Sequence, residues 1–130
     1  MIKLLLLVFM IFFHLLDDYA LQGILAQMKQ RDWWEKNVPR GSYPLCKYDY
    51  IVALIEHAFS WTVMVHIPAW IFSYIYGAKQ RPATLVLAFL LCWGVHAIVD
   101  HAKANWHVIN LIMDQSIHLW QVIIIWLLYI

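Results

Sequence analysis

Four long apolar segments alternate with polar connections along the chain. They cover approximately residues 2–26, 50–76, 83–104 and 108–130. A helix rises about 1.5 Å per residue, so roughly 20 apolar residues cross a hydrocarbon core of about 30 Å, and each segment is long enough. Lipid offers no partner for free backbone groups, and these segments are too long for the strands of a barrel. The pattern therefore predicts an all-α fold: an integral membrane four-helix bundle with up-down topology, in a single transmembrane domain over residues 1–130.

The connections assign the segment ends to two faces of the bundle. The first and third segments end on one face, here called side A, and the second and fourth begin there; the opposite face is side B. The longest connection, 27–49, lies on side A and is long enough to cover a site there, whereas 77–82 predicts a tight turn on side B. Aromatic residues expected at the side A interface are Trp33, Trp34, Tyr48, Tyr50 and Trp106; those expected at side B are Trp70, Tyr74, Tyr76, Trp126 and Tyr129.

The distribution of cationic residues slightly favours one orientation. Side A carries Lys29, Arg31, Lys36, Arg40, Lys47 and Lys103; side B carries Lys3, Lys79 and Arg81. The positive-inside rule therefore favours a cytoplasmic side A, and the expected location is a bacterial inner membrane. If Lys29 and Lys103 serve a site, the count falls to four against three. The N-terminal run has the character of a signal peptide but lacks a small-residue cleavage site, so we expect it to be retained as the first span.

Composition supports lipid as the solvent for most of this chain. Hydrophobic residues make up 64% of the sequence and charged residues 13%, an apolar share that a soluble domain of 130 residues could not bury. The formal net charge of +1 gives no reason to expect a nucleic acid partner. Cys46 and Cys92 are too few for a disulfide framework. The expected partner is the lipid bilayer, and an oligomer stays open.

Polar side chains recur inside the apolar segments at helical spacing, which puts each set on one face of its helix. All four sets lie at a similar depth toward side A, so an up-down bundle brings them into one layer. The sets are His14, Asp18, Gln22 and Lys29 on the first segment; His57 on the second; His96, Asp100, Lys103 and His107 on the third; and Asp114, Gln115 and His118 on the fourth.

Carboxylates inside a membrane span are costly. An aspartate at the centre costs about 2.5–3.5 kcal/mol on insertion scales, so Asp18, Asp100 and Asp114 together cost roughly 8–10 kcal/mol there. Pairing, a metal ion or a wet cavity must offset that cost. Three hypotheses stay open: a structural network of Asp–His and Asp–Lys pairs, a path for protons or ions, and a metal site.

The metal hypothesis accounts for most of the polar layer, because helical bundles build metal centres from carboxylate–histidine pairs one turn apart. The expected ligands are His14, Asp18, His57, His96, Asp100, Asp114 and His118. Their number suits two cations, or one cation beside a general base, and a divalent metal, zinc first, is the expected cofactor. Gln22, Lys29 and Gln115 are expected to support the ligands. The candidate catalytic residues are Asp18, Asp100 and Lys103, with Lys103 binding an anion.

Other polar residues are expected to lie outside this layer. On an α-helix Asp17 points about 100° away from Asp18, toward a neighbour or solvent, so Asp18 is the expected ligand of the two. His66 is expected to form an interhelical hydrogen bond and Cys92 to pack. His101 points about 140° away from His96, and His107 is on the same stripe as His96 but near the helix end, as at most a supporting residue. Ser60 and Thr62, near His57, show no arrangement typical of a nucleophile.

Four short motifs resemble a known family. They are DYALQGILAQMK at 18–29, the histidine of EHAFSW at 56–61, HAIVDHAK at 96–103 and DQSIH at 114–118. Together they resemble a family of small membrane proteins of phages and bacteria that is catalogued as a domain of unknown function. They are similar, more distantly, to bacterial inner-membrane proteins described as predicted metal-dependent hydrolases. The family pattern falls on Asp18, Gln22, Lys29, His57, His96, Asp100, Lys103, Asp114, Gln115 and His118.

The leading hypothesis for function is a metal-dependent hydrolase that acts on a phospholipid or another membrane phosphoester. The alternative is a phage-type membrane interaction protein, acting in superinfection exclusion or regulation, in which the polar layer is structural. An ion conduit is less favoured, because the second and third segments offer little polarity toward side B beyond His66 and Ser73.

Overall fold

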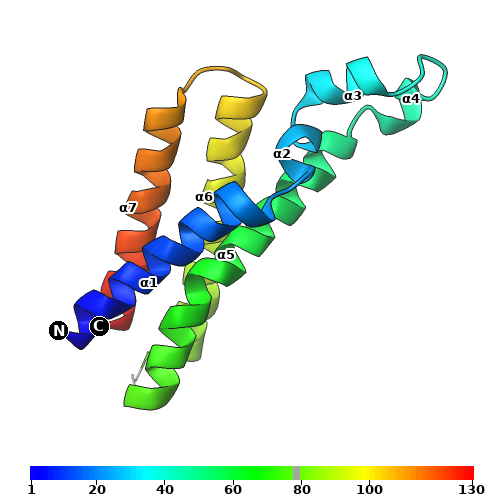
Figure 1. Ribbon diagram of the computed structural model, residues 1–130. Helices are drawn as coiled ribbons and strands as arrows, with labels where there is room; N and C mark the ends of the chain where they lie inside the picture. Colours follow the sequence, from blue (N-terminus) through cyan, green and yellow to red (C-terminus); the bar gives the residue numbers. More distant parts are fainter. Residues whose placement is uncertain (78–79) are drawn as a thin grey trace.

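The computed structural model describes residues 1–77 and 80–130, and these ranges contain helices, turns and no strands (Figure 1). The elements are α1 (Ile2–Leu16), the π-helix η1 (Asp17–Leu21), α2 (Leu25–Met28), α3 (Arg31–Asn37), α4 (Tyr43–Cys46), α5 (Asp49–Tyr76), α6 (Pro82–Ala104) and α7 (Leu111–Tyr129). The all-α prediction is confirmed. The turn predicted at 77–82 includes residues 78 and 79, which lie outside the described residues.

Four helices are long and apolar enough to cross a membrane, which identifies a multi-pass membrane protein. They are Ile2–Leu21, Tyr43–Tyr76, Pro82–Ala104 and Leu111–Tyr129. The first ends before the predicted residue 26, because Gly23 adopts a left-handed φ of +53° and the helix direction changes there. The last begins three residues later than predicted, where the Asn110 side chain accepts a hydrogen bond from the Met113 amide and caps α7.

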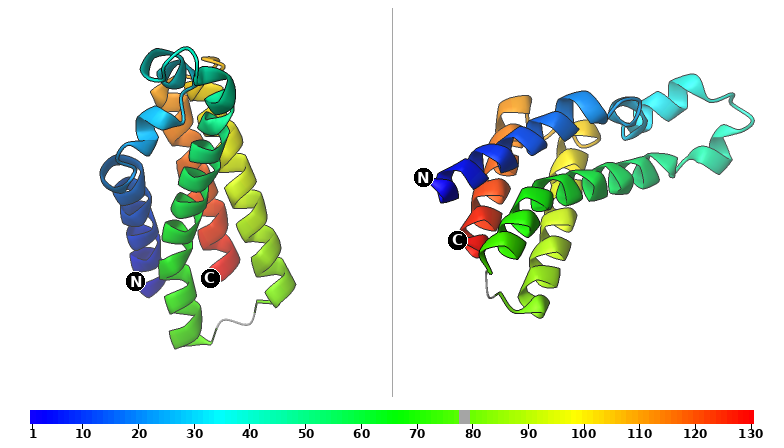
Figure 2. Two further views of the ribbon diagram at one scale, coloured as in Figure 1. Left: turned by 90° about the vertical axis from the view of Figure 1, so that its right-hand side faces the viewer. Right: turned by 60° about the horizontal axis from the view of Figure 1, so that its bottom comes forward.

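The four spans form an antiparallel ring with up-down topology (Figures 1 and 2). α1 packs against α5 and α7, and α6 packs against the same two helices from the other side. The two ends of the chain lie next to each other on side B, where the Trp126 indole donates a hydrogen bond of 2.7 Å to the Lys3 carbonyl. The outward faces of the helices carry exposed large apolar side chains, as expected for surfaces that contact lipid.

The half of the bundle toward side B has an apolar core. Its buried members include Leu6, Met10, Val65, Val122 and Ile125. Tyr129 also belongs to this core and is 1% exposed, so its predicted place at the side B interface is wrong. Its ring packs against His66, which lies in the same half, at a centroid distance of 6.3 Å.

The connection on side A projects beyond the bundle (Figure 1 and the right-hand view of Figure 2). α3 and α4 are joined through Glu35, which accepts hydrogen bonds from the Tyr43 hydroxyl at 2.8 Å and from Arg31 Nε at 3.1 Å. The Tyr43 hydroxyl, followed by the Arg31 charge, holds the pKa of Glu35 below its usual range, so this carboxylate stays ionised at neutral pH. The expectation that the connection covers a site is met only by its first residues, described below.

Candidate metal centre

The π-helix η1 turns two consecutive aspartates toward the bundle interior. The Gln22 amide donates to the Asp17 carbonyl at 3.0 Å, five residues back, so this turn holds more residues than an α-helical one. Neighbouring side chains therefore diverge less than the expected 100°. Asp17 is 1% exposed and the Asp18 side chain 7% exposed. Two surroundings were expected for Asp17, a neighbour or solvent, and the structure shows the first: it faces the neighbouring helix α5.

Each of the four spanning helices places one histidine in the same buried layer. These are His14 on α1, His57 on α5, His96 on α6 and His118 on α7. All four are at most 1% exposed, and the His96 ring stacks on the His118 ring at a centroid distance of 4.0 Å. Asp18, Asp100 and Asp114 lie among them, so the structure brings together the residues that the helical spacing had placed on one layer.

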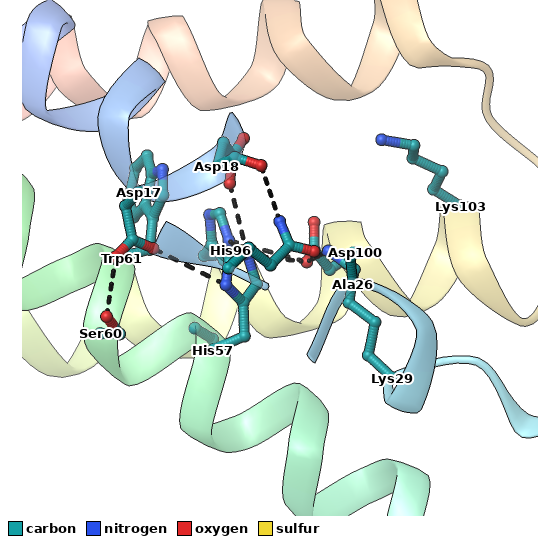
Figure 3. A network of polar contacts seen from close by, with 12 residues as sticks. Asp17, Asp18, Ala26, Lys29, His57, Ser60, Trp61, His96, Asp100 and Lys103 are labelled. Atoms are coloured by element: carbon teal, nitrogen blue, oxygen red, sulfur yellow. Dashed lines mark hydrogen bonds and ion pairs between the residues drawn. The ribbon is translucent and has the colours of Figure 1, made fainter. Parts of the chain in front are cut away.

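His57 lies at the centre of the first part of this layer (Figure 3). Its Nε2 is 3.3 Å from Asp18 Oδ1, 3.4 Å from Asp100 Oδ2 and 3.4 Å from His96 Nε2. A single N–H can satisfy one of these acceptors well, whereas a cation can be shared by all of them. The donor atoms therefore converge as ligands do.

His118 shows the same pattern on the other side of the layer. Its Nε2 lies 3.3 Å from Asp100 Oδ1 and 3.3 Å from Asp114 Oδ1. Asp100 thus presents one carboxylate oxygen to His118 and the other to His57. This aspartate links the two parts of the layer.

Outer hydrogen bonds orient the rings of His118 and His57. Gln121 Nε2 donates to the Cys92 carbonyl at 3.0 Å, which leaves Gln121 Oε1 to accept from His118 Nδ1 at 3.1 Å. The proton of a neutral His118 then lies on Nδ1, and the Nε2 lone pair faces the carboxylates. On the other side Asp17 Oδ2 is 3.7 Å from His57 Nδ1, and the Ser60 hydroxyl donates to Asp17 Oδ1 at 2.7 Å.

Sequence reasoning missed these orienting residues, although their spacing carried a signal. Ser60 and Gln121 each lie three residues after a layer histidine, which puts each on the same helix face as that histidine. Trp61 was missed as well: its ring stacks on His96 at a centroid distance of 4.1 Å.

His14 has a different role from the one expected. Its Nδ1 accepts a 2.8 Å hydrogen bond from the Trp61 indole, which can only donate. The proton of a neutral His14 is then on Nε2, and neither nitrogen offers a free lone pair. His14 is therefore a neighbour of the ligand cluster in this structure, 3.8 Å from Asp18 Oδ2.

Two groups of three side chains are close enough to hold a metal ion within the described residues. One is formed by Asp18, His57 and His96, the other by His96, Asp100 and His118, and in each group the donor atoms lie within 4.8 Å of one another. His96 belongs to both. Carboxylate oxygen and imidazole nitrogen are the donors that zinc and other divalent first-row metals accept. The layer can therefore hold a metal ion.

Two lysines reach into the layer and pair with its carboxylates. Lys29 Nζ lies 2.6 Å from Asp100 Oδ2, and Lys103 Nζ lies 2.6 Å from Asp114 Oδ2. The expectation for Lys29 was a supporting place, and that for Lys103 was anion binding; in this structure both form direct ion pairs. Asp114 lies outside the two groups of three. With Asp17 included, the layer contains four aspartates and two lysines.

A cavity of about 400 Å³ lies on the side A face of this layer. At the bottom of this cavity, Gln115 Nε2 donates to Asp18 Oδ2 at 3.0 Å and to Asp114 Oδ2 at 3.1 Å. Gln22 is another lining residue, and its side-chain Nε2 donates to the Asp18 backbone carbonyl. Only the first residues of the long connection contribute to the wall. The lining residues are Asp18, Tyr19, Gln22, Ala26, Lys29, Gln30, Asp100, Lys103, Ala104, His107, Leu111, Asp114 and Gln115.

The remaining histidines lie outside the ligand cluster. His66 is fully buried in the apolar half, and its Nδ1 lies 2.8 Å from the Thr62 carbonyl of its own helix. His101 stacks on Tyr50 at a centroid distance of 6.0 Å. His107, with a left-handed φ of 54°, contributes only to the cavity wall.

The fold and the site together define a class: a multi-pass α-helical membrane protein with a buried His/Asp cluster that can hold a metal ion. Comparison with known protein families, with curated proteins and with solved structures finds no match to this chain. The resemblance to a family of unknown function stays a prediction.

Proposed function

We propose that this protein is a membrane-embedded, zinc-dependent hydrolase that acts on a phosphoester at the membrane surface. The observation that carries the proposal is the buried layer, in which His57, His96 and His118 converge on Asp18 and Asp100. The cavity beside these residues provides a place for a substrate. The position of the cavity at the side A ends of the spans supports a substrate with a lipid headgroup.

Charge supports a bound cation over a purely structural network. Lys29 and Lys103 pair with Asp100 and Asp114, whereas Asp17 and Asp18 form no ion pair with a lysine in the described part of the chain, so a divalent cation beside them would be favourable. Without a cation, the lone pair of His118 Nε2 faces two carboxylate oxygens, and a proton on that nitrogen can serve only one of them well. Burial of uncompensated charge is unfavourable, so a ligand that neutralises the layer stabilises the fold.

The expected division of labour follows from the distances. A metal ion held by these histidines and aspartates would supply a water of lowered pKa and would polarise a phosphoryl oxygen. Asp114 is the best candidate for general base, because it lies outside both groups of three, lines the cavity, and has a buried Oδ1 without a hydrogen-bond partner. Asp18 and Asp100 are then ligands, and Lys103 remains the expected anion-binding group.

An ion conduit is disfavoured by the residues directly below the layer. One helical turn toward side B from each layer histidine lies a buried apolar residue: Met10, Trp61, Cys92 and Val122. These four buried side chains lie between the polar layer and His66. The interaction-protein hypothesis makes no use of the cavity, and it predicts no turnover.

Turnover by metal-loaded protein tests the proposal. Purified protein is stripped with a chelator, reloaded with zinc and incubated with short-chain phosphatidic acid, phosphatidylglycerol and an aryl phosphate, with release of product followed by ³¹P NMR. We expect zinc-dependent release that falls about 10²–10⁴-fold in Asp114→Asn, with zinc content unchanged. His101→Ala, beside the ligand Asp100, is the matched control and keeps full activity. Zinc-loaded wild type without product release from this panel would refute the hydrolase proposal.

The location proposed is a bacterial inner membrane with side A in the cytoplasm. Of the cationic residues on side A, Lys29 and Lys103 pair with aspartates of the buried layer, which leaves Arg31, Lys36, Arg40 and Lys47 outside the layer to set the orientation. A cytoplasmic side A would expose the cavity to that compartment. Reaction of single-cysteine variants in the α3–α4 segment with an impermeant thiol reagent tests this orientation.

A further inference from the structure

The cavity wall contains two ammonium groups that form ion pairs with aspartates in this structure. Lys29 is 9% exposed and extends from the end of α2 to Asp100 Oδ2 (Figure 3). Lys103 extends from α6 to Asp114 Oδ2. Both lysines line the same cavity. In this state an entering anion meets cations that are already neutralised by carboxylates.

The anchoring of Lys29 is specific. Asn105, at the end of α6, donates from Nδ2 to the Lys29 carbonyl at 3.0 Å and accepts from the Arg31 amide at 2.8 Å. This two-point contact fixes the backbone of residues 29–31 against the mouth of the cavity. The Lys29 side chain can therefore change partner while its backbone stays in place.

Asp100 Oδ2 is the atom at which Lys29 and a metal ion compete. It accepts from Lys29 and also lies 3.4 Å from His57 Nε2 and 3.8 Å from His96 Nε2. A divalent cation bound between the histidines and this oxygen withdraws the negative charge that holds the ammonium group. The Lys29 ammonium then needs another anionic partner, and the cavity is the space open to it.

We propose that metal binding converts this cavity into a binding site for a phosphate group, with Lys29 and Lys103 released from their aspartates to bind the phosphate oxygens. A phosphate group is the fitting anion, because its oxygens can accept from both ammonium groups while one faces the metal. Lysine serves as a point charge for phosphate in other proteins. This inference rests on the proposed metal site and names the ligand that would enter it.

Linked binding gives a test that does not depend on turnover. Binding of inorganic phosphate to the protein in detergent micelles is measured by calorimetry, with and without bound zinc. We expect zinc to tighten phosphate binding at least about fivefold, and phosphate to tighten zinc binding by the same factor, because coupling between two sites is reciprocal. Equal phosphate affinity with and without zinc would overturn the inference.

Lysine variants separate this role from a structural one. Lys29→Met and Lys103→Met should each weaken phosphate binding about tenfold in the zinc form, the effect of losing one charge-assisted hydrogen bond. Lys36→Met, exposed on α3, is the matched control, and Lys29→Arg should retain binding. Without phosphate, Lys29→Met should bind zinc at least as tightly as wild type, because a competitor is gone. Weaker zinc binding in that variant, or unchanged phosphate affinity in both methionine variants, would contradict the proposal.

A third experiment distinguishes two sources of the phosphate group, a lipid headgroup and a water-soluble phosphate. Nanodiscs of phosphatidylcholine with and without phosphatidic acid are compared as hosts for the zinc form. Loss of inorganic phosphate binding only in the phosphatidic acid discs identifies a lipid headgroup as the occupant, and retained binding in both identifies a water-soluble phosphate. If the protein binds no zinc at all, the proposed function fails; if it binds zinc but no phosphate, only this inference fails.

Discussion

The two halves of the bundle both bury histidine, with different surroundings. In the half toward side A, His57 and His96 contact each other and the carboxylates of the layer, which also contains two ammonium groups. In the half toward side B, His66 is equally buried, but its Nδ1 lies against the Thr62 carbonyl of its own helix, and aromatic rings surround it. A buried histidine alone is thus a packing residue, and the carboxylates around a histidine define the site.

The two halves also differ in how their outer residues are used. Toward side A, Ser60, Trp61 and Gln121 point polar atoms at aspartate and histidine and fix their orientation. Toward side B, the corresponding positions are filled by apolar side chains such as Val65 and Ile125. Preorganised polar contacts behind a ligand are typical of metal centres, since they set the tautomer and ring direction of the ligating histidine.

Removal of Asp100 should have the largest effect on the half toward side A, because both stability and metal binding depend on this residue. Asp100→Ala leaves the Lys29 ammonium buried without its partner, and we expect the free energy of unfolding to fall by about 3–5 kcal/mol together with loss of bound metal. Denaturant titration in detergent and elemental analysis measure the two effects. The double variant Asp100→Ala/Lys29→Met should recover much of the stability and none of the metal. If the double variant is no more stable than Asp100→Ala, the unpaired Lys29 ammonium is not the cause of the lost stability.

Neutralisation of Asp17 should weaken the metal site while the fold is preserved. Asp17→Asn keeps the shape and a hydrogen bond with Ser60 but removes the charge that faces His57 Nδ1. We expect zinc affinity to fall about 10–100-fold, the usual effect of losing a partner behind a ligand. Competition with a chromophoric chelator measures this change, with exposed Asp32→Asn as the control. Equal affinities in the two variants would exclude a role for Asp17 in orienting His57.

The Trp61 indole connects the polar layer to the core below it. Trp61→Phe keeps an aromatic ring near His96 but removes the donor to His14 Nδ1, a buried acceptor. The unfolding free energy should fall by about 1–3 kcal/mol. Trp120→Phe, whose ring faces outward on α7, is the control and should change stability little. Similar losses in both variants would mean that the hydrogen bond adds nothing beyond the packing of the indole.

Substitution of His66 should have the smallest effect on stability and, unlike changes in the layer, no effect on metal content. His66→Asn should lower the unfolding free energy by about 0.5–1.5 kcal/mol through its lost hydrogen bond and leave metal content unchanged. Elemental analysis beside a thermal melt measures both. Loss of metal from this variant would show that the two halves do not act separately.

Helical periodicity predicted much of this architecture. Four apolar segments indicated the four spans, and the one-turn spacing of pairs such as His96 and Asp100 placed them on one face. The π-helix could not be predicted in this way, because it changes the angle between the neighbouring side chains of Asp17 and Asp18, and periodicity left open whether Asp17 faces a neighbour or solvent. The end of the first span before Gly23 was not predicted either. A single glycine in an apolar run can lie inside a helix or end it, and periodicity does not distinguish the two.

Contacts between helices were also beyond what periodicity can give. The spacing predicts which face a side chain occupies but not its partner on another helix, so the pairing of Lys29 with Asp100 across 71 positions was not foreseen. The same holds for the hydrogen bond from Trp61 to His14 and for the burial of Tyr129, which depend on how the helices are rotated against each other.

The central claim is that the His/Asp layer holds a metal ion, and metal stoichiometry tests it most directly. Wild type, Asp100→Ala, His118→Ala and the control His101→Ala are purified in mild detergent at near-neutral pH, dialysed against metal-free buffer after zinc loading, and measured by mass spectrometry of the elements. We predict about one zinc ion or more per chain in wild type and His101→Ala, and a clear loss in the other two. Wild type without stoichiometric metal, or with metal that persists in both layer variants, would contradict the claim.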